Sequence, residues 1–155
     1  MGRRVPMIVV SGLDQLEGEI AAAPNPVVLV FDADNTLVPQ GASIDHFQRE
    51  VVAAVERFGT HPNVRRVIVL TNGPDRGVPD IIHRGNKPWT TRRRLDLEGE
   101  GSVWVVGDQV LTDGVLAWRI GARYVSLAID VEHESPAQAR MRRIGRMISP
   151  LFFVS

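Results

Sequence analysis

Two pairs of aspartates suggest the chemistry of this sequence, and each pair follows a short apolar run. Asp32 and Asp34 come after the first run, and Asp108 and Asp113 come after a later one. Carboxylates held this close repel one another, and a bound cation would offset that repulsion. The oxygen ligands, together with the lack of cysteine and of any histidine cluster, favour magnesium. We therefore expect a Mg²⁺ site that includes all four aspartates.

A hydroxyl, an amide and an ammonium group lie between the two acidic pairs. Thr71 and Asn72 follow another apolar run, and Lys87 precedes the second acidic pair. Magnesium and lysine together neutralise charge on transferring phosphoryl oxygens, and a carboxylate can attack phosphorus to form an aspartyl-phosphate. Uncatalysed hydrolysis of phosphate monoesters is so slow that enzymes lower its barrier by roughly 20 kcal/mol or more. The sequence therefore predicts that these groups act together in phosphoryl transfer.

The reactive residues need a scaffold that brings them together, and the apolar pattern predicts one. Continuous apolar runs suit strands that are covered on both faces, as in a parallel sheet flanked by helices. One helix is predicted from Ser43, its N-cap, to Gly59, and a second from Thr112 or Asp113 to Gly121. Four strands are predicted, at 27–31, 67–70, 103–106 and 124–127.

The repeated order of strand, helix and strand places the chain in the α/β class. We predict a Rossmann-like open parallel sheet with helices on both faces, formed as a single domain by residues 1–155. Ligands bind at the carboxyl ends of the strands in such folds, and the reactive residues lie there. Segment 71–87 contains Gly73-Pro74, so we expect no crossover helix there and at most a short strand at 80–83.

Four short segments hold the reactive residues: Asp32-Ala33-Asp34-Asn35-Thr36, Leu70-Thr71-Asn72-Gly73, Lys87-Pro88 and Gly107-Asp108-Gln109-Val110-Leu111-Thr112-Asp113. Their order and content resemble the four motifs of the haloacid dehalogenase (HAD) superfamily. The first and fourth are similar to those of its capless subclass IIIA, which contains YqeG-like proteins and phosphatidylglycerophosphate phosphatases. The resemblance covers roughly residues 25 to 130. It implies the HAD core, and the gaps between the motifs are too short for a cap domain.

The resemblance implies a role for each matched residue of the reaction. Asp32 would attack phosphorus, while Asp34 would protonate the leaving oxygen and later activate water. Thr71 and Asn72 would bind the phosphoryl group of the substrate. Lys87 would hold both the nucleophile and the phosphate. Because no cap domain would cover these residues, we expect the site to be open to solvent.

For the metal, the resemblance implies that Asp108 binds Mg²⁺ together with Asp32 and the main-chain carbonyl of Asp34. Asp113 would complete or orient the metal shell. Two plainer interpretations stay open, with Asp113 as a helix N-cap and Thr36 as a structural turn residue. Four loop residues could line the substrate entrance, although simple solvation is the plainer interpretation: Asp75, Asp80, His83 and Arg84.

We predict a Mg²⁺-dependent phosphomonoesterase that acts on a phosphorylated substrate. An open site suits large or exposed phosphates, and the subclass points to phosphatidylglycerophosphate. A phospho-receiver-like signalling domain is one alternative, but receivers place their acidic pair before the phosphorylated aspartate. A non-catalytic HAD scaffold is another, and it would normally have lost Asp32, Asp34 or Lys87, all of which are present.

The net charge and the hydropathy of the chain limit which partners and which cellular location we expect. Eighteen Lys and Arg balance eighteen Asp and Glu, so we expect no nucleic-acid partner. We find no signal peptide and no apolar run near the roughly 20 residues that span a bilayer, and we expect a cytoplasmic protein. The basic and apolar tail, 134–155, is expected to be a docked helix, with peripheral membrane contact as the alternative. An oligomer whose neighbouring subunit covers the site also stays open.

Overall fold

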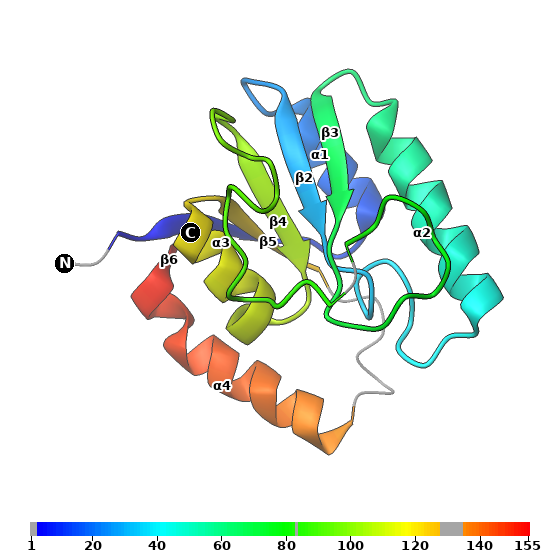
Figure 1. Cartoon of the computed structure of the whole chain (residues 1–155). Coiled ribbons are helices and arrows are strands. Elements are labelled where there is room, and N and C mark those ends of the chain that lie inside the picture. The colour runs from blue at the N-terminus through cyan, green and yellow to red at the C-terminus, as the bar shows by residue number, and fades with distance from the viewer. Residues whose placement is uncertain (1–2, 83, 128–134) are drawn as a thin grey trace.

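The computed structural model describes residues 3–82, 84–127 and 135–155, and these form an open parallel α/β fold (Figure 1). The strands lie in one sheet in the order β3-β2-β4-β5-β1-β6, and every pairing is parallel. The predicted fold class is thus confirmed. The described elements are β1 (Val5–Val9), α1 (Leu13–Ala21), β2 (Val27–Phe31), α2 (Ile44–Gly59), β3 (Val64–Val69), β4 (Val103–Gly107), the π-helical turn η1 (Val110–Gly114), α3 (Val115–Ile120), β5 (Arg123–Ser126), α4 (Pro136–Phe152) and β6 (Phe153–Val154).

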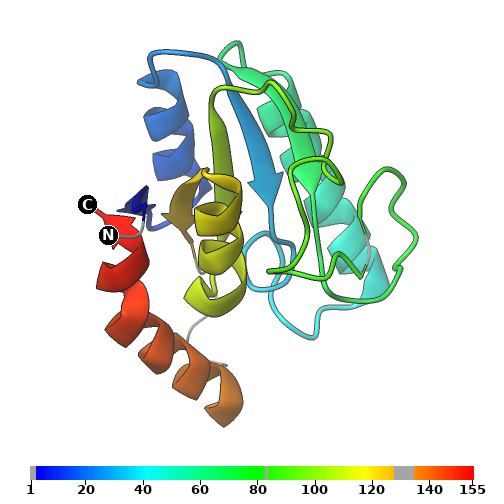
Figure 2. The ribbon, with the colours of Figure 1, turned by 60° about the vertical axis from the view of Figure 1, so that its left-hand side comes forward.

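Helices cover both faces of the sheet (Figures 1 and 2). α1 and α2 pack on one face, where Phe47 and Phe58 of α2 meet Phe31 of β2. α3 packs on the other face, where Leu116 contributes to a second apolar cluster. Every residue of β2 and β4 is buried. This burial explains why both strands are continuous apolar runs rather than alternating ones.

The helix predicted after the first motif is confirmed as α2. Ser43 caps it, because the Ser43 hydroxyl accepts a hydrogen bond from the His46 amide at 3.2 Å. Phe47, Val51 and Phe58 are buried in the core, whereas Ile44 and Val52 are exposed. α2 ends at Gly59, as predicted, and its C-cap is Thr60.

The second predicted helix begins differently. A π-helical turn, η1, precedes α3, and the N-cap of this turn is Gln109 rather than Thr112 or Asp113. Asp113 lies inside η1 and its side chain accepts a hydrogen bond from the Gln109 amide at 3.3 Å. The N-cap interpretation of Asp113 is therefore wrong. The predicted end is right, because Gly121 closes α3 at a φ of 69°, in the left-handed region that glycine favours.

The N-terminal part of the fold, β1 and α1, was not predicted, nor was β6. β1 pairs with β5 on one side, and on the other only with the two residues of β6. Pro6 lies within β1, and proline normally argues against an interior strand. Because β6 is so short, β1 is close to an edge strand, where proline is tolerated.

The connection from β3 to β4 forms neither helix nor regular strand in its described residues. The strand expected at 80–83 is reduced to an isolated bridge between Ile82 and Leu70, and His83 lies outside the described residues. In place of a crossover helix, Leu95 and Leu97 of this connection fill the apolar cluster on the α3 face. In the part of the chain that the structure describes, no cap domain stands over the sheet, and none of the helices is long and apolar enough to cross a bilayer.

Candidate functional site

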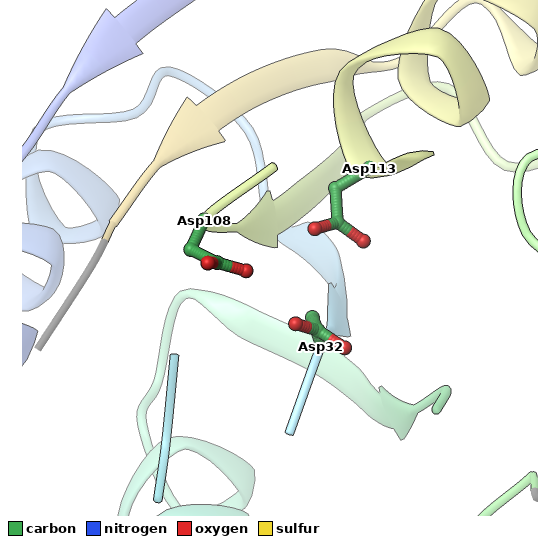
Figure 3. A group of neighbouring side chains, drawn as sticks. All are labelled: Asp32, Asp108 and Asp113. Carbon is green, nitrogen blue, oxygen red and sulfur yellow. The ribbon is translucent and has the colours of Figure 1, made fainter. Parts of the chain in front are cut away.

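Three buried aspartates meet at the carboxyl ends of β2 and β4. Asp32 follows β2, Asp108 follows β4, and Asp113 projects from η1, so that the three carboxyl groups face one another (Figure 3). One oxygen of each lies within 4.8 Å of the others, and all three residues are buried. This group could hold a metal ion, and its all-carboxylate chemistry fits the hard oxygen donors that Mg²⁺ prefers. Asp34 was predicted to bind the metal through its main-chain carbonyl, and its side chain is not part of this group.

The end of β2 is folded so that Asp32 stays in the sheet while the chain turns. The Asp32 amide donates to the Val106 carbonyl at 2.8 Å, which extends the ladder between β2 and β4. Asn35 then adopts a φ of 58°, and its side-chain amide donates to Asp108 at 3.1 Å. Thr36 is fully buried, and its hydroxyl lies 3.4 Å from Oδ2 of Asp32. The first motif thus also ties β2 to β4.

Lys87 lies between two of the three aspartates. Its ammonium donates to Asp32 and to Asp113, each at 2.6 Å, and its side chain is 4% exposed. The Asn72 side chain fixes the Lys87 main chain from both sides, because it accepts from the amide at 2.8 Å and donates to the carbonyl at 3.2 Å. The shortened connection therefore still delivers lysine to the site. Asn72 was predicted to bind phosphate, and its side chain contacts the Lys87 main chain.

Burial and mutual repulsion control ionisation in the group. Burial, followed by the charge of Asp113, raises the pKa of Asp32 well above its usual value, although Lys87 opposes the rise. Burial and Asp113 likewise raise the pKa of Asp108. Burial alone would lower the pKa of Lys87, but the charges of Asp113 and Asp32 outweigh it and raise that pKa. The lysine therefore stays protonated, whereas burial and mutual repulsion disfavour the ionised forms of Asp32 and Asp108, an effect that a bound metal ion would offset.

Gly107 is required for the close approach of η1 to β4. A Cβ at this position would lie 2.2 Å from the carboxyl carbon of Asp113. Such a contact is far too short, so any side chain here would displace Asp113 from Lys87. The Tyr124 hydroxyl donates to the Gly107 carbonyl at 3.2 Å and holds the same turn from β5.

Asp34 lies outside the group of three aspartates and pairs with Arg76. Both oxygens of Asp34 accept from the guanidinium of Arg76, each at 2.8 Å. The guanidinium carbon lies 3.4 Å from the centroid of the Phe47 ring, which fixes its plane. The Thr71 hydroxyl lies 3.3 Å from one Asp34 oxygen, while it accepts from the Gly73 amide at 3.0 Å.

Arg76 was not predicted as a site residue. It follows the exposed Asp75 in an irregular loop, and nothing in its spacing distinguishes it from a solvated arginine. Of the four loop residues considered for the entrance, Asp75, Asp80 and Arg84 are exposed and none of the three lines the cavity at the site. The fourth, His83, lies outside the described residues.

A polar cavity of about 210 Å³ opens beside the aspartates. Part of its wall comes from the C-terminal helix α4, through Gln138 and Met141, and Gln138 contacts Gln40 of the opposite wall. Arg142, also on α4, lies 3.8 Å from Asp108. The contribution of α4 to the wall was not predicted. Six of the predicted site residues line the cavity: Asp32, Asp34, Thr71, Asn72, Lys87 and Asp108.

Comparison with known proteins adds no relative: no family model, no curated protein and no solved structure matches this chain. What stands is a parallel α/β fold with a buried aspartate group that could bind a metal ion beside a polar cavity.

Proposed function

We propose that the chain is a Mg²⁺-dependent phosphomonoesterase of the capless HAD type, with Asp32 as its nucleophile. One observation carries the proposal: Asp32 lies 2.6 Å from a buried lysine, within a group of three aspartates, at the wall of a cavity of about 210 Å³. These are the parts that phosphoryl transfer requires, because catalysis consists mainly of positioning and charge neutralisation.

Asp32 is oriented for attack by two contacts. Lys87 donates to one of its oxygens, and the Thr36 hydroxyl lies near the other. In the first step, an Asp32 oxygen forms a bond to phosphorus while the bond from phosphorus to the leaving oxygen breaks. In the second step, water attacks the phosphorus of the aspartyl-phosphate, which releases inorganic phosphate and restores the carboxylate. Lys87 offsets the charge on the transferring oxygens in both steps.

Mg²⁺ held by Asp32, Asp108 and Asp113 would neutralise further charge on the phosphoryl oxygens. Asp34 is the proton carrier of the scheme. It gives a proton to the leaving oxygen in the first step and accepts one from water in the second. Arg76 holds both Asp34 oxygens, and the Thr71 hydroxyl lies beside them, so the carboxylate is kept at the cavity wall.

The phosphoryl group is bound by the cavity wall at Thr71 and Asn72, beside Asp34. The Thr71 hydroxyl, which lies 3.3 Å from Asp34, and the Asn72 main-chain amide would be its donors, because the Gly73 amide already donates to the Thr71 hydroxyl. The Asn72 side chain serves a different role, since it positions Lys87. Because no cap domain covers the described residues, we propose a large or exposed phosphate as substrate, with phosphatidylglycerophosphate as the first candidate.

A phosphatase screen tests the proposal. p-Nitrophenyl phosphate and a panel of soluble and lipid phosphates, including phosphatidylglycerophosphate, are incubated with protein in Mg²⁺ and in EDTA. We expect turnover with Mg²⁺ only, and none for Asp32→Asn, whose circular dichroism should match the parent chain. The matched control is Asp45→Asn, an exposed aspartate of α2, which should retain full turnover. Undiminished hydrolysis by Asp32→Asn would refute the mechanism.

The same screen separates the alternatives. A phospho-receiver-like domain would accept one phosphoryl group from a small donor without multiple turnovers of a phosphomonoester. A non-catalytic scaffold would bind Mg²⁺ without hydrolysing any phosphate of the panel. Either result would overturn the proposed function while leaving the metal site in place.

A further inference from the structure

α4 rests on the rest of the fold by a narrow stripe. Of its described residues only Gly145 is buried, and a Cβ there would lie 2.8 Å from Val110 of η1. Near the end of α4, Phe152 meets the Trp118 ring edge-on, with ring centroids 5.1 Å apart. The opposite side of the helix faces outward, away from the sheet (Figure 2).

The outward side of α4 is apolar. Met147 is 74% exposed and Leu151 is 68% exposed, and Ile144 and Met141 are 43% and 36% exposed. Spacings of three, three and four residues place these four side chains in one row along the helix. We call this row the apolar ridge. A docked helix of the predicted kind would have buried this row, so docking accounts for only one side of α4.

The charges beside the apolar ridge are of one sign. α4 contains four arginines and no acidic residue. Arg142 is turned toward Asp108, whereas Arg140, Arg143 and Arg146 are exposed. An anionic bilayer offers negative head groups above hydrocarbon, which complements an apolar row flanked by arginines. A second copy of the chain would instead bring like charges together, because a two-fold contact pairs the same surface with itself.

The apolar ridge is continuous with the candidate site. Met141 belongs to both, since it lines the cavity beside the aspartates and begins the exposed row. A surface that covers the ridge therefore lies next to the cavity mouth.

We propose that α4 docks on the surface of anionic phospholipid bilayers through the apolar ridge and its three exposed arginines. The ridge enters the boundary between head groups and acyl chains, while the arginines contact lipid phosphates. Binding itself does not depend on catalysis. Its consequence, that phosphates on the bilayer reach the cavity directly, rests on the proposed function.

Vesicle co-sedimentation tests the docking with the full chain. The vesicles are phosphatidylcholine with or without phosphatidylglycerol, at low and at high salt. We expect binding to the anionic vesicles at low salt, weaker binding at high salt because the arginine charges are screened, and little binding to phosphatidylcholine alone. Absence of binding to anionic vesicles at low salt would overturn the proposal, as would equal binding to both vesicle types.

Two sets of variants separate the ridge from the charges. Met147→Ser with Leu151→Ser should weaken binding by about tenfold or more, because the largest exposed apolar side chains are lost. Arg140→Gln with Arg143→Gln and Arg146→Gln should weaken it by a similar factor and remove most of its salt dependence. Unchanged binding in either set would contradict the proposal.

The controls lie on another helix. Val52→Ser and Arg49→Gln change an exposed apolar and an exposed basic residue of α2, and both should bind vesicles as the parent chain does. Asp32→Asn should also bind normally, so a failure of the proposed function leaves this test intact. If the ridge variants abolish a concentration-dependent dimer and the parent chain binds no vesicles, a second copy covers the ridge and lipid does not.

Discussion

Replacing Lys87 by methionine removes the only cation that contacts Asp32 and Asp113 among the described hydrogen bonds and ion pairs. All three side chains are nearly inaccessible, with exposures of 4%, 11% and 1%. Removing one partner from a buried charge pair costs about 3–5 kcal/mol, because the remaining charge stays buried without compensation. We expect the free energy of unfolding of Lys87→Met to fall by that amount in EDTA. For a chain of this length, the melting temperature should fall by about 6–20 °C.

The loss of stability in Lys87→Met should depend on pH in a defined direction. The raised pKa of Asp32 in the folded protein rises further once the lysine that opposes it is gone. A group with a raised folded pKa contributes stability below its unfolded pKa, of about 4, and loses it as pH rises through the folded pKa. The deficit of Lys87→Met should therefore be smaller in mild acid and grow with pH. Adding Asp113→Asn to Lys87→Met should restore part of the stability.

Urea unfolding followed by circular dichroism in EDTA measures these differences across pH. The matched control is Arg65→Met, which removes an ion pair between Arg65, 58% exposed, and Glu100. Exposed pairs contribute about 0–1 kcal/mol, so the control should lose little stability at any pH. A loss below about 1 kcal/mol in Lys87→Met, or a loss that does not change with pH, would contradict the electrostatic account of the site.

Two substitutions and one pH dependence test the rest of the site. Gly107→Ala places a Cβ 2.2 Å from the Asp113 carboxyl carbon, and the Mg²⁺ affinity measured by calorimetry should fall by about 10–100-fold as that ligand is displaced. Arg76→Ala removes both hydrogen bonds that hold Asp34, and the rate of p-nitrophenyl phosphate hydrolysis should fall by up to about 100-fold. The raised pKa of Asp32 predicts that Mg²⁺ affinity falls as pH drops toward that pKa, because protons compete for the same oxygens, and levels off above it.

Each of these has a matched control or a contrary outcome. Gly99→Ala changes another glycine, at a φ of 84° and with nothing near its Cβ, and should leave Mg²⁺ affinity unchanged. Arg84→Ala changes an exposed arginine outside the cavity wall and should hydrolyse substrate at the parent rate. Mg²⁺ affinity that is flat across pH, or that rises in acid, would exclude Asp32 from the metal site.

The sequence predicts the structure best where the local residue pattern of a segment agrees with its place in the fold. β2 is a continuous apolar run of five residues, buried on both sides, and its bounds are those predicted. α2 has its cap at Ser43 and its apolar residues at helical spacing. The convergence of Asp32 with Asp108 follows from topology, because residues after adjacent parallel strands meet at one edge of the sheet.

Other parts of the site depend on packing that the local sequence does not encode. Arg76 lies in an irregular loop, and its role depends on Asp34 and on the ring of Phe47, both far away in the chain. The wall formed by α4 depends on how its glycine, Gly145, seats against η1. Asp113 was expected as a helix cap or a metal ligand, and only the π-helical turn turns its side chain inward.

Detection of a phosphoryl group on Asp32 tests most directly whether Asp32 is the nucleophile. The Asp34→Asn variant, which lacks the group that activates water, is mixed with p-nitrophenyl phosphate and Mg²⁺, quenched in acid and examined by peptide mass spectrometry. We expect a mass increase of one phosphoryl group on the peptide that contains Asp32, removed by hydroxylamine and absent in EDTA. Turnover by the parent chain with no such adduct in the variant, or with the adduct on another residue, would contradict it.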